Sequence, residues 1–398
     1  MFRIRCMIFI LACLGLGMLA ADCRATSPLD AAPVRQALQP IRFGATVSLE
    51  GKYAGPSGML RDGFKLWEKQ VNERGGLLGR PVELVLHDDK SNPELVRELY
   101  TKLIAEDKVD MVLSPYGTPL TLAAAEVTTR YGYTMLACGA SGDEIWNGRF
   151  KNVFGMYSPG KRYFIGLVDI MASNGLNSVA ILYENSPFSR DAAEGAKEWA
   201  ERFGLKVSLY RSYASGKTEL PGLLRQARGE NPDGLILVSY PEDSYLLLDL
   251  MKTEKYRPRV LAFTIASSYP DFYEKAGGIA EGVFGSSQWE PDERIPFPGT
   301  KRFIADFFKF TNRLPSYHSG SAYAGCQLME RAVRHCDCFD QARIADFIRS
   351  LDTVTVVGRF KVGLDGKQTG HNSIIIQWQN GKKEIVFPAN MQTAPPRI

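Results

Sequence analysis

Residues 41–76, IRFGATVSLEGKYAGPSGMLRDGFKLWEKQVNERGG, hold a strand and a helix in succession. The apolar run over residues 41–49 predicts a buried strand, and a loop with glycine and proline follows it. Four apolar side chains then recur at i, i+4, i+7 and i+11, which predicts a helix with one buried face. They are Leu60, Phe64, Trp67 and Val71. Gly75 and Gly76 end this helix.

The same alternation of strand and helix continues along the chain. Strands are predicted at residues 82–86, 111–114 and 134–138, with a helix that begins at Asn92-Pro93 and another over residues 118–130. This order predicts parallel strands joined by crossover helices, and therefore one α/β lobe.

A second lobe of the same kind is predicted after residue 160. Its strands are expected at residues 179–183, 206–210, 235–239 and 260–264, each paired with a helix. Three further helices, at residues 301–312, 320–335 and 341–350, and a strand at 374–378 must complete the two sheets already begun. The predicted fold class is α/β, with two Rossmann-like lobes, parallel central sheets and a hinge where the chain passes between them.

The first residues have the layout of a secretory signal peptide. Arg3 and Arg5 precede an apolar stretch from residue 7 to residue 21, which is shorter than the roughly 20 residues of a spanning helix. We expect residues 1–25 to be removed and the protein to be periplasmic. Lipid anchoring at Cys23 is not expected, because Asp22 stands where a small residue is required.

Composition and charge exclude several classes of protein. The chain is 45% hydrophobic and 23% charged, with a formal net charge of +4, as in an ordinary globular protein. It has no block of lysine and arginine, so nucleic-acid binding is not expected. The cysteines after the signal segment permit a disulfide but lack zinc-site spacing. They are Cys138, Cys326, Cys336 and Cys338.

No catalytic or cofactor motif is complete. Residues 215–218, SGKT, resemble the end of a phosphate-binding loop, but Arg211 stands where a glycine is required. Residues 139–143, GASGD, miss the nucleophile elbow because Asp143 occupies the fifth position. The four histidines have no metal-ligand spacing. We therefore expect a protein that is not an enzyme and that holds no metal or cofactor.

Two loops are suited to bind an anion. In residues 114–119, SPYGTP, Thr118 is expected to cap a helix whose N–H groups and positive dipole end face the ligand. In residues 138–144, CGASGDE, small residues expose backbone and Ser141 supplies a hydroxyl. Both loops follow strands, where open parallel sheets bind ligands. The alternative, that both are ordinary helix caps, stays open from these residues alone.

Several motifs together resemble the leucine/isoleucine/valine-binding family of type I periplasmic binding proteins. They are FGATVSLEG at 43–51, VNERGGLLG at 71–79, Asp88-Asp89, GAS at 139–141, AGG at 276–278 and EGV at 281–283. The resemblance spans residues 41–378. It implies a two-lobed fold with a three-crossover hinge and delivery of the ligand to an inner-membrane ABC permease.

The resemblance also implies the lobe boundaries. Lobe one is expected at residues 40–157 and 289–358, and lobe two at 158–288 and 359–398. The three connections between them are expected near residues 157–160, 288–291 and 358–361. An extracytoplasmic ligand sensor of the same fold is the alternative function. Such a sensor would be expected to carry a following membrane span, which the residues up to Ile398 do not show.

Residue by residue, the resemblance assigns a ligand site. It implies that Thr118 provides the hydroxyl that binds a carboxylate, and that Ala140 and Ser141 provide a backbone and hydroxyl pair. Phe188 and Tyr240 match the aromatic wall of the second lobe.

The first lobe adds two more aromatic side chains to this assignment. Tyr53 and Tyr116 lie on neighbouring loops of that lobe and are expected to line the entrance.

The sequence departs from the family at one position. Amino-acid-binding members place an acidic residue just after the fourth strand of the second lobe, where it pairs with the ammonium of the ligand. Ile265 stands there, followed by Ala266, Ser267 and Ser268. The ligand is therefore expected to be an amino acid held in another way, or an aliphatic or aromatic carboxylate or amide.

Overall fold

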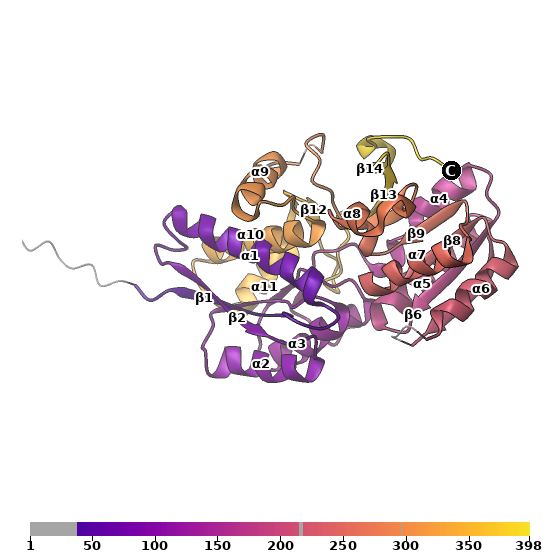
Figure 1. Cartoon of the computed structure of the whole chain (residues 1–398). Coiled ribbons are helices and arrows are strands. Elements are labelled where there is room, and N and C mark those ends of the chain that lie inside the picture. Colours follow the sequence, from indigo (N-terminus) through magenta and orange to yellow (C-terminus); the bar gives the residue numbers. More distant parts are fainter. Residues whose placement is uncertain (1–37, 215–217, 296) are drawn as a thin grey trace, which may run out of the picture. The chain divides into compact units, whose positions relative to one another are not determined.

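The computed structural model describes residues 38–214, 218–295 and 297–398. The expected signal peptide, residues 1–25, lies outside these ranges, as do residues 215–217 of the SGKT segment. The described chain forms two larger sheets and one two-stranded sheet. Its elements are labelled in Figure 1.

The first sheet is parallel throughout, with strand order β2-β1-β3-β4-β5. The predicted strands are confirmed, and β5 is an additional strand that the sequence pattern did not indicate. Three helices make the crossovers. The strands are β1 (Ile41–Val47), β2 (Val82–Asp88), β3 (Met111–Leu113), β4 (Met135–Ala137) and β5 (Val153–Gly155), and the helices are α1 (Ala54–Glu73), α2 (Pro93–Ala105) and α3 (Thr118–Arg130).

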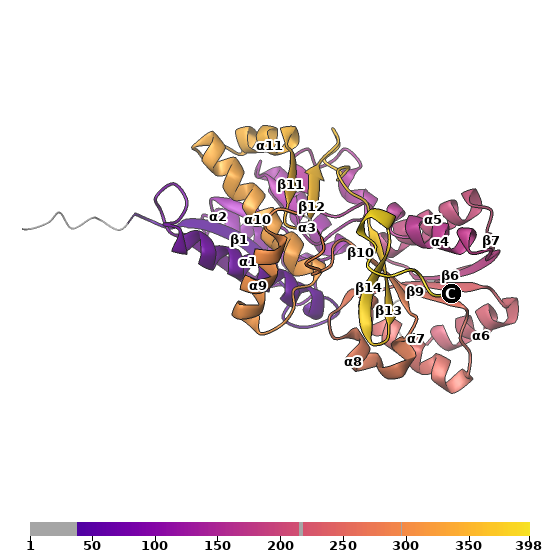
Figure 2. The ribbon, with the colours of Figure 1, turned by 90° about the horizontal axis from the view of Figure 1, so that it is seen from above.

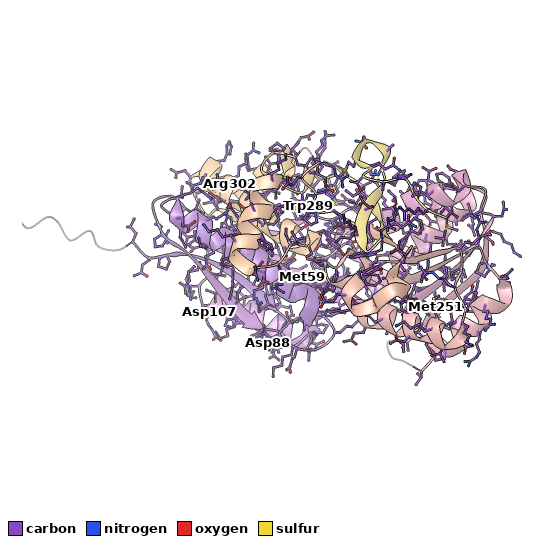
Figure 3. All side chains as sticks on the ribbon, turned by 45° about the horizontal axis from the view of Figure 1, so that its top comes forward. Met59, Asp88, Asp107, Met251, Trp289 and Arg302 are labelled. Atoms are coloured by element: carbon purple, nitrogen blue, oxygen red, sulfur yellow. The ribbon has the colours of Figure 1, made fainter. Side chains whose placement is uncertain are left out.

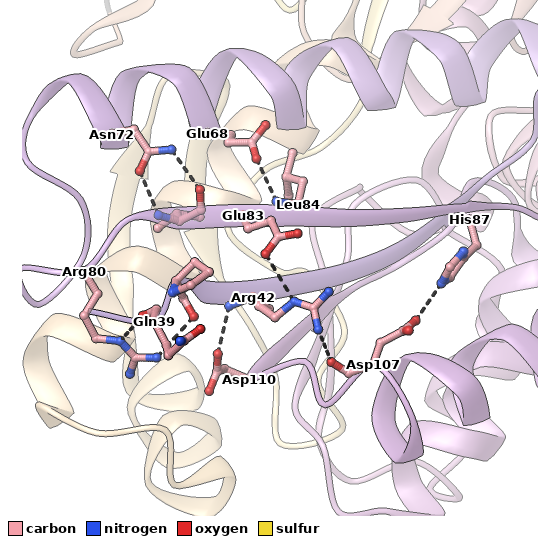
Figure 4. A network of polar contacts seen from close by, with 12 residues as sticks. Gln39, Arg42, Glu68, Asn72, Arg80, Glu83, Leu84, His87, Asp107 and Asp110 are labelled. Atoms are coloured by element: carbon pink, nitrogen blue, oxygen red, sulfur yellow. Dashed lines mark hydrogen bonds and ion pairs between the residues drawn. The ribbon is translucent and has the colours of Figure 1, made fainter. Parts of the chain in front are cut away.

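Polar side chains of α1 hold the edge strand β2, as Figure 4 shows. The amide of Asn72 donates to the Val82 carbonyl at 2.8 Å and accepts from the Val82 N–H at 2.7 Å. The carboxylate of Glu68 accepts from the Leu84 N–H at 2.7 Å. Backbone groups that would otherwise be open at the sheet edge are thereby paired within the chain.

The second sheet has the order β14-β13-β10-β9-β8-β6-β7. Helices pack against these strands, and together they form a second α/β lobe. Its strands are β6 (Ser178–Glu184), β7 (Lys206–Tyr213), β8 (Gly234–Val238), β9 (Val260–Phe263), β10 (Phe284–Ser287), β13 (Ile374–Gln379) and β14 (Lys382–Phe387). Its helices are α4 (Ile165–Ser173), α5 (Pro187–Arg202), α6 (Leu220–Glu230), α7 (Pro241–Glu254) and α8 (Phe272–Ala276).

The central strands of the second sheet are parallel, as predicted, and one edge of it is antiparallel. Strand β13 runs antiparallel to β10, and β14 runs antiparallel to β13. The turn between β13 and β14 is Asn380-Gly381, and both residues have positive φ. Asn-Gly in this conformation is the preferred two-residue turn of a β-hairpin, so the chain folds straight back on itself.

The C-terminal helices return to the first lobe. They are α9 (Thr300–Thr311), α10 (Tyr317–Cys336) and α11 (Gln341–Ser350). Helix α10 packs along α1, and the indole N–H of Trp67 donates to Glu330 at 2.9 Å. The two helices lie side by side in both Figure 1 and Figure 2. The three predicted helices are confirmed.

Three connections join the two sheets, and a hydrogen-bonded chain ties them together. The Ser158 N–H donates to the Gln288 side chain at 2.7 Å, and the amide of Gln288 donates to the Ser373 hydroxyl at 3.1 Å. Trp289, labelled in Figure 3, follows Gln288 and is fully buried. The hinge therefore has three backbone segments held in contact by one glutamine.

The third connection lies later than residues 358–361. That segment is strand β12 (Gly358–Lys361), which pairs with β11 (Asp352–Thr355). The chain after β12 stays beside β5, because the Gly155 N–H donates to the Gly366 carbonyl at 2.9 Å. It enters the second sheet only at β13. The lobe ranges expected from the sequence, 40–157 with 289–358 and 158–288 with 359–398, stay a prediction.

The four cysteines of the described chain are free thiols. Cys138, Cys326 and Cys336 are buried. The disulfide that the sequence permitted is therefore not formed in this structure.

Candidate ligand-binding site

The loops that follow β3 and β4 are joined through Thr118. Gly117, with φ of 89°, occupies the N-cap position of α3, so Thr118 is the first residue of the helix rather than its cap. A positive φ favours glycine, which explains the position of the helix start. The Gly142 N–H donates to the hydroxyl oxygen of Thr118 at 3.1 Å. The two loops predicted to bind an anion are thus in direct contact.

Ser141 links the first lobe to the segment that leads into the second. Its hydroxyl forms a 3.0 Å hydrogen bond with the hydroxyl of Tyr163, and its carbonyl accepts from the Gly160 N–H at 2.9 Å. Ala140, the preceding residue, is buried. Residues 140 and 141 therefore lie where the chain passes from one sheet to the other.

Six of the seven site residues expected from the sequence surround one cavity. Two walls come from the first lobe and two aromatic rings from the second, where Phe188 lies in the first turn of α5 and Tyr240 precedes α7. The expected residues that line the cavity are Tyr116, Thr118, Ala140, Ser141, Phe188 and Tyr240. Tyr53 does not line it, but its ring packs against the rings of Tyr240 and Tyr116, at centroid distances of 4.9 and 6.1 Å.

Aromatic side chains fill most of the space between the walls. The cavity has a volume of about 10 Å³, close to the least that holds one water molecule. The rings of Tyr163 and Phe188 are 5.2 Å apart, and those of Phe188 and Tyr240 are 6.1 Å apart. A ligand as large as an amino acid requires these walls to separate, and a motion at the three connections would separate them.

The chemistry of the cavity is polar but uncharged. Among the described residues, those that line it carry no formal charge, and Ile265 forms part of the wall. Burial raises the pKa of the Tyr163 phenol, and burial followed by repulsion from Glu184 raises the pKa of Tyr53 to about 12. Both phenols therefore stay protonated at neutral pH and can donate hydrogen bonds.

Three tyrosines of the cavity were not found from the sequence: Tyr157, Tyr163 and Tyr317. Tyr157 follows β5, a strand only three residues long, so no predicted strand end pointed to it. Tyr317 begins α10, far from the other site residues in sequence. The positions of Tyr157 and Tyr317 match no motif in the sequence.

A buried histidine stands behind these tyrosines. The Nδ1 of His318 hydrogen-bonds the Tyr157 hydroxyl at 2.9 Å, and its ring centroid lies 5.1 Å from that of Tyr116. Burial lowers the pKa of His318 to about 3. The imidazole is therefore neutral over the physiological range and adds no charge to the site.

Contacts between the lobes flank the cavity on one side. The Asp143 N–H donates to the Asp191 carboxylate at 2.7 Å, and Arg190 pairs with Glu144 at 3.1 Å. Asp191 lies on α5, whereas Asp143 and Glu144 follow β4. These contacts exist only while the lobes are together.

We expect acid to favour the closed form through Asp191. Burial, and then repulsion from Asp143 and Glu144, raise its pKa from 3.8 to about 6, although the Asp143 N–H and Lys161 act in the opposite direction. Separation of the lobes hydrates the carboxyl and returns its pKa toward the ordinary value. The closed form thus binds the proton more tightly. The contribution to closure is complete below pH about 4 and is lost as pH rises through about 6.

Small-angle scattering of the ligand-free protein measures this effect. The radius of gyration should fall between pH 7.5 and 4.5, and Asp191→Asn should remove that part of the change. An equal pH response in the Asn variant would assign it to other groups.

The described residues contain no group of three histidine, cysteine or acidic side chains placed to hold a metal ion. Nor do they contain a helix with the length and apolar character needed to cross a membrane.

Two α/β sheets joined by three connections, with an uncharged cavity lined from both, define a hinged solute-binding protein. A family model described as periplasmic binding protein matches residues 40–383. The chain belongs to this family, and its resemblance to the leucine/isoleucine/valine-binding branch is confirmed. Because the family consists of binding proteins, the expectation of a protein that is not an enzyme is confirmed as well.

Individual relatives agree with this assignment. The chain is 24% identical over 358 residues to Leu/Ile/Val-binding protein homolog 7 of Brucella suis biovar 1, which covers 84% of this chain and 89% of that protein. Its fold is similar to a leucine binding protein from Thermotoga maritima, with a TM-score of 0.79 and 17% identity over 87% of this chain and 97% of that one. It is also similar to a solute binding protein from R. palustris in complex with benzoate, with a TM-score of 0.76 and 18% identity. That match covers 89% of this chain and 98% of the other.

Proposed function

We propose that the protein captures a small polar ligand in the cavity between its lobes and delivers it to an inner-membrane ABC permease. The proposed ligand is an amino acid or a related aliphatic or aromatic carboxylate or amide. We further propose that residues 1–25 direct export and that the mature protein is periplasmic. The observation that supports this function best is the convergence of residues from both sheets on one uncharged, aromatic cavity.

The arrangement suits a ligand with one anionic end and an apolar body. The first turn of α3 offers N–H groups with their positive dipole end, and the hydroxyls of Thr118 and Ser141 lie beside it. Phe188 and Tyr240 offer aromatic faces to the rest of the ligand. Their positions around the cavity support a role in ligand binding for Thr118, Ser141, Phe188 and Tyr240.

The apolar wall at Ile265 affects whether the ligand can carry an α-ammonium. Ile265 lines the cavity, and the family resemblance expects an acidic partner for the ammonium at this position. A bare ammonium against this apolar side chain would be poorly solvated. The similar proteins include one named for leucine and one in complex with benzoate. We infer that the ligand does not need an ammonium.

Native mass spectrometry of the protein as purified, followed by a thermal-shift screen of amino acids and carboxylic acids, tests the function. A true ligand at 100 times its Kd should add about 2.7 kcal/mol of apparent stability. A 2-oxo or simple carboxylate analogue should bind within about tenfold of the matching amino acid, or about 1.4 kcal/mol. A thousandfold preference for the amino acid would refute the carboxylate proposal.

A further inference from the structure

A lysine of the first lobe reaches across to the second beside the cavity. Lys52 lies in the loop between β1 and α1, and its ammonium forms an ion pair with Glu184 at the end of β6. The same ammonium lies 4.4 Å from the centroid of the Tyr240 ring and 5.7 Å from that of Tyr53. Lys52 therefore makes a cation–π contact with a residue of the cavity wall.

The carboxylate that Lys52 meets is buried. The side chain of Glu184 is only 2% exposed, and its second oxygen has no hydrogen-bond partner among the described residues. Asp243, a second acid nearby, is partly engaged by the Tyr213 hydroxyl at 2.8 Å. Without Lys52, this end of the second lobe would present buried negative charge next to Tyr240.

A cation over an aromatic face and paired with a carboxylate is also what an α-ammonium would need from a protein. Here the chain supplies that cation itself. We propose that Lys52 is a specificity-determining residue: by neutralising the buried Glu184 beside Tyr240, a wall residue of the cavity, it lets the cavity accept carboxylates that lack an ammonium. This inference rests on the proposed function.

Lys52→Met tests the proposal because it keeps the unbranched apolar stem of the side chain and removes its charge. In the native protein, a matched amino acid and its des-amino analogue should bind within about tenfold of each other. In Lys52→Met, the unpaired Glu184 carboxylate should favour the amino acid by at least a further tenfold. Lys52→Arg should keep the native ratio, and the double variant with Glu184→Gln should lose the gain. An unchanged ratio in Lys52→Met would overturn the proposal.

A second probe separates this inference from the function on which it rests. n-Butylammonium carries the cation without a carboxylate, and its binding can be followed by NMR line broadening. It should bind at least tenfold more tightly to Lys52→Met than to the native protein, and the gain should vanish in the double variant. This result would support the role of Lys52 even if no carboxylate bound. No gain, in a variant with a native circular dichroism spectrum, would refute it.

Discussion

Thr118→Val should weaken ligand binding by a factor of about 10 to 100, and Ser141→Ala by a similar factor. Each change removes a hydroxyl that lines the cavity, and a hydrogen bond to a charged group contributes about 1.5 to 3 kcal/mol. Thr118→Val also leaves the Gly142 N–H without its acceptor, so the unliganded variant should lose about 1 kcal/mol of stability. Isothermal titration and melting of the unliganded proteins measure the two effects separately.

Thr121→Val is the matched control. Thr121 lies one turn further along α3, is buried, and donates its hydroxyl to the Pro115 carbonyl at 3.3 Å, but it does not line the cavity. The same substitution there should cost stability and leave affinity within about twofold. If Thr118→Val and Ser141→Ala both bind normally, the first-lobe side of the site is wrongly assigned.

Gly63→Ala and Gly58→Ala should change stability in opposite directions, although both lie inside α1. A Cβ at Gly63 would lie 2.3 Å from the Ser319 carbonyl oxygen and 2.9 Å from the Ala322 Cβ, so α10 must move away from α1. Overpacking of this kind costs about 1 to 3 kcal/mol. A Cβ at Gly58 meets nothing within 4 Å, and alanine in a helix is favoured over glycine by about 1 kcal/mol.

Urea denaturation of the two variants gives the comparison directly. The free energies of unfolding should differ by about 2 to 4 kcal/mol, with Gly58→Ala the more stable. Equal stabilities would mean that the contact between α1 and α10 can relax without cost. The close approach of these helices would then not depend on glycine.

The parts of the fold that were predicted are those with a local signal. Helix α3 was placed at residues 118–130 because Pro119 and the apolar pattern fix its start and its buried face. Strand β5 has only three residues, too few for a pattern to develop. Residues 358–361, where the third connection was expected, form strand β12, and the following chain stays beside β5 through a contact between Gly155 and Gly366 that no local pattern contains.

The site shows the same division between local and distant information. The loops at residues 114–119 and 138–144 were found because each follows a strand and begins a helix or turn. Tyr157, Tyr163 and Tyr317 complete the cavity from other segments. The ion pair between Lys52 and Glu184 joins residues 132 positions apart. Their proximity follows from the closed arrangement of the two lobes, which no spacing rule describes.

Neither lobe can finish folding before almost the whole chain has been made. The first lobe needs α10, whose Glu330 meets Trp67 of α1, and the second needs β13, which pairs with β10. Contacts between segments so far apart in sequence close late, since their loop entropy must be lost first. Both lobes should therefore gain these contacts late in synthesis, so that the unfinished chain depends on chaperones against aggregation.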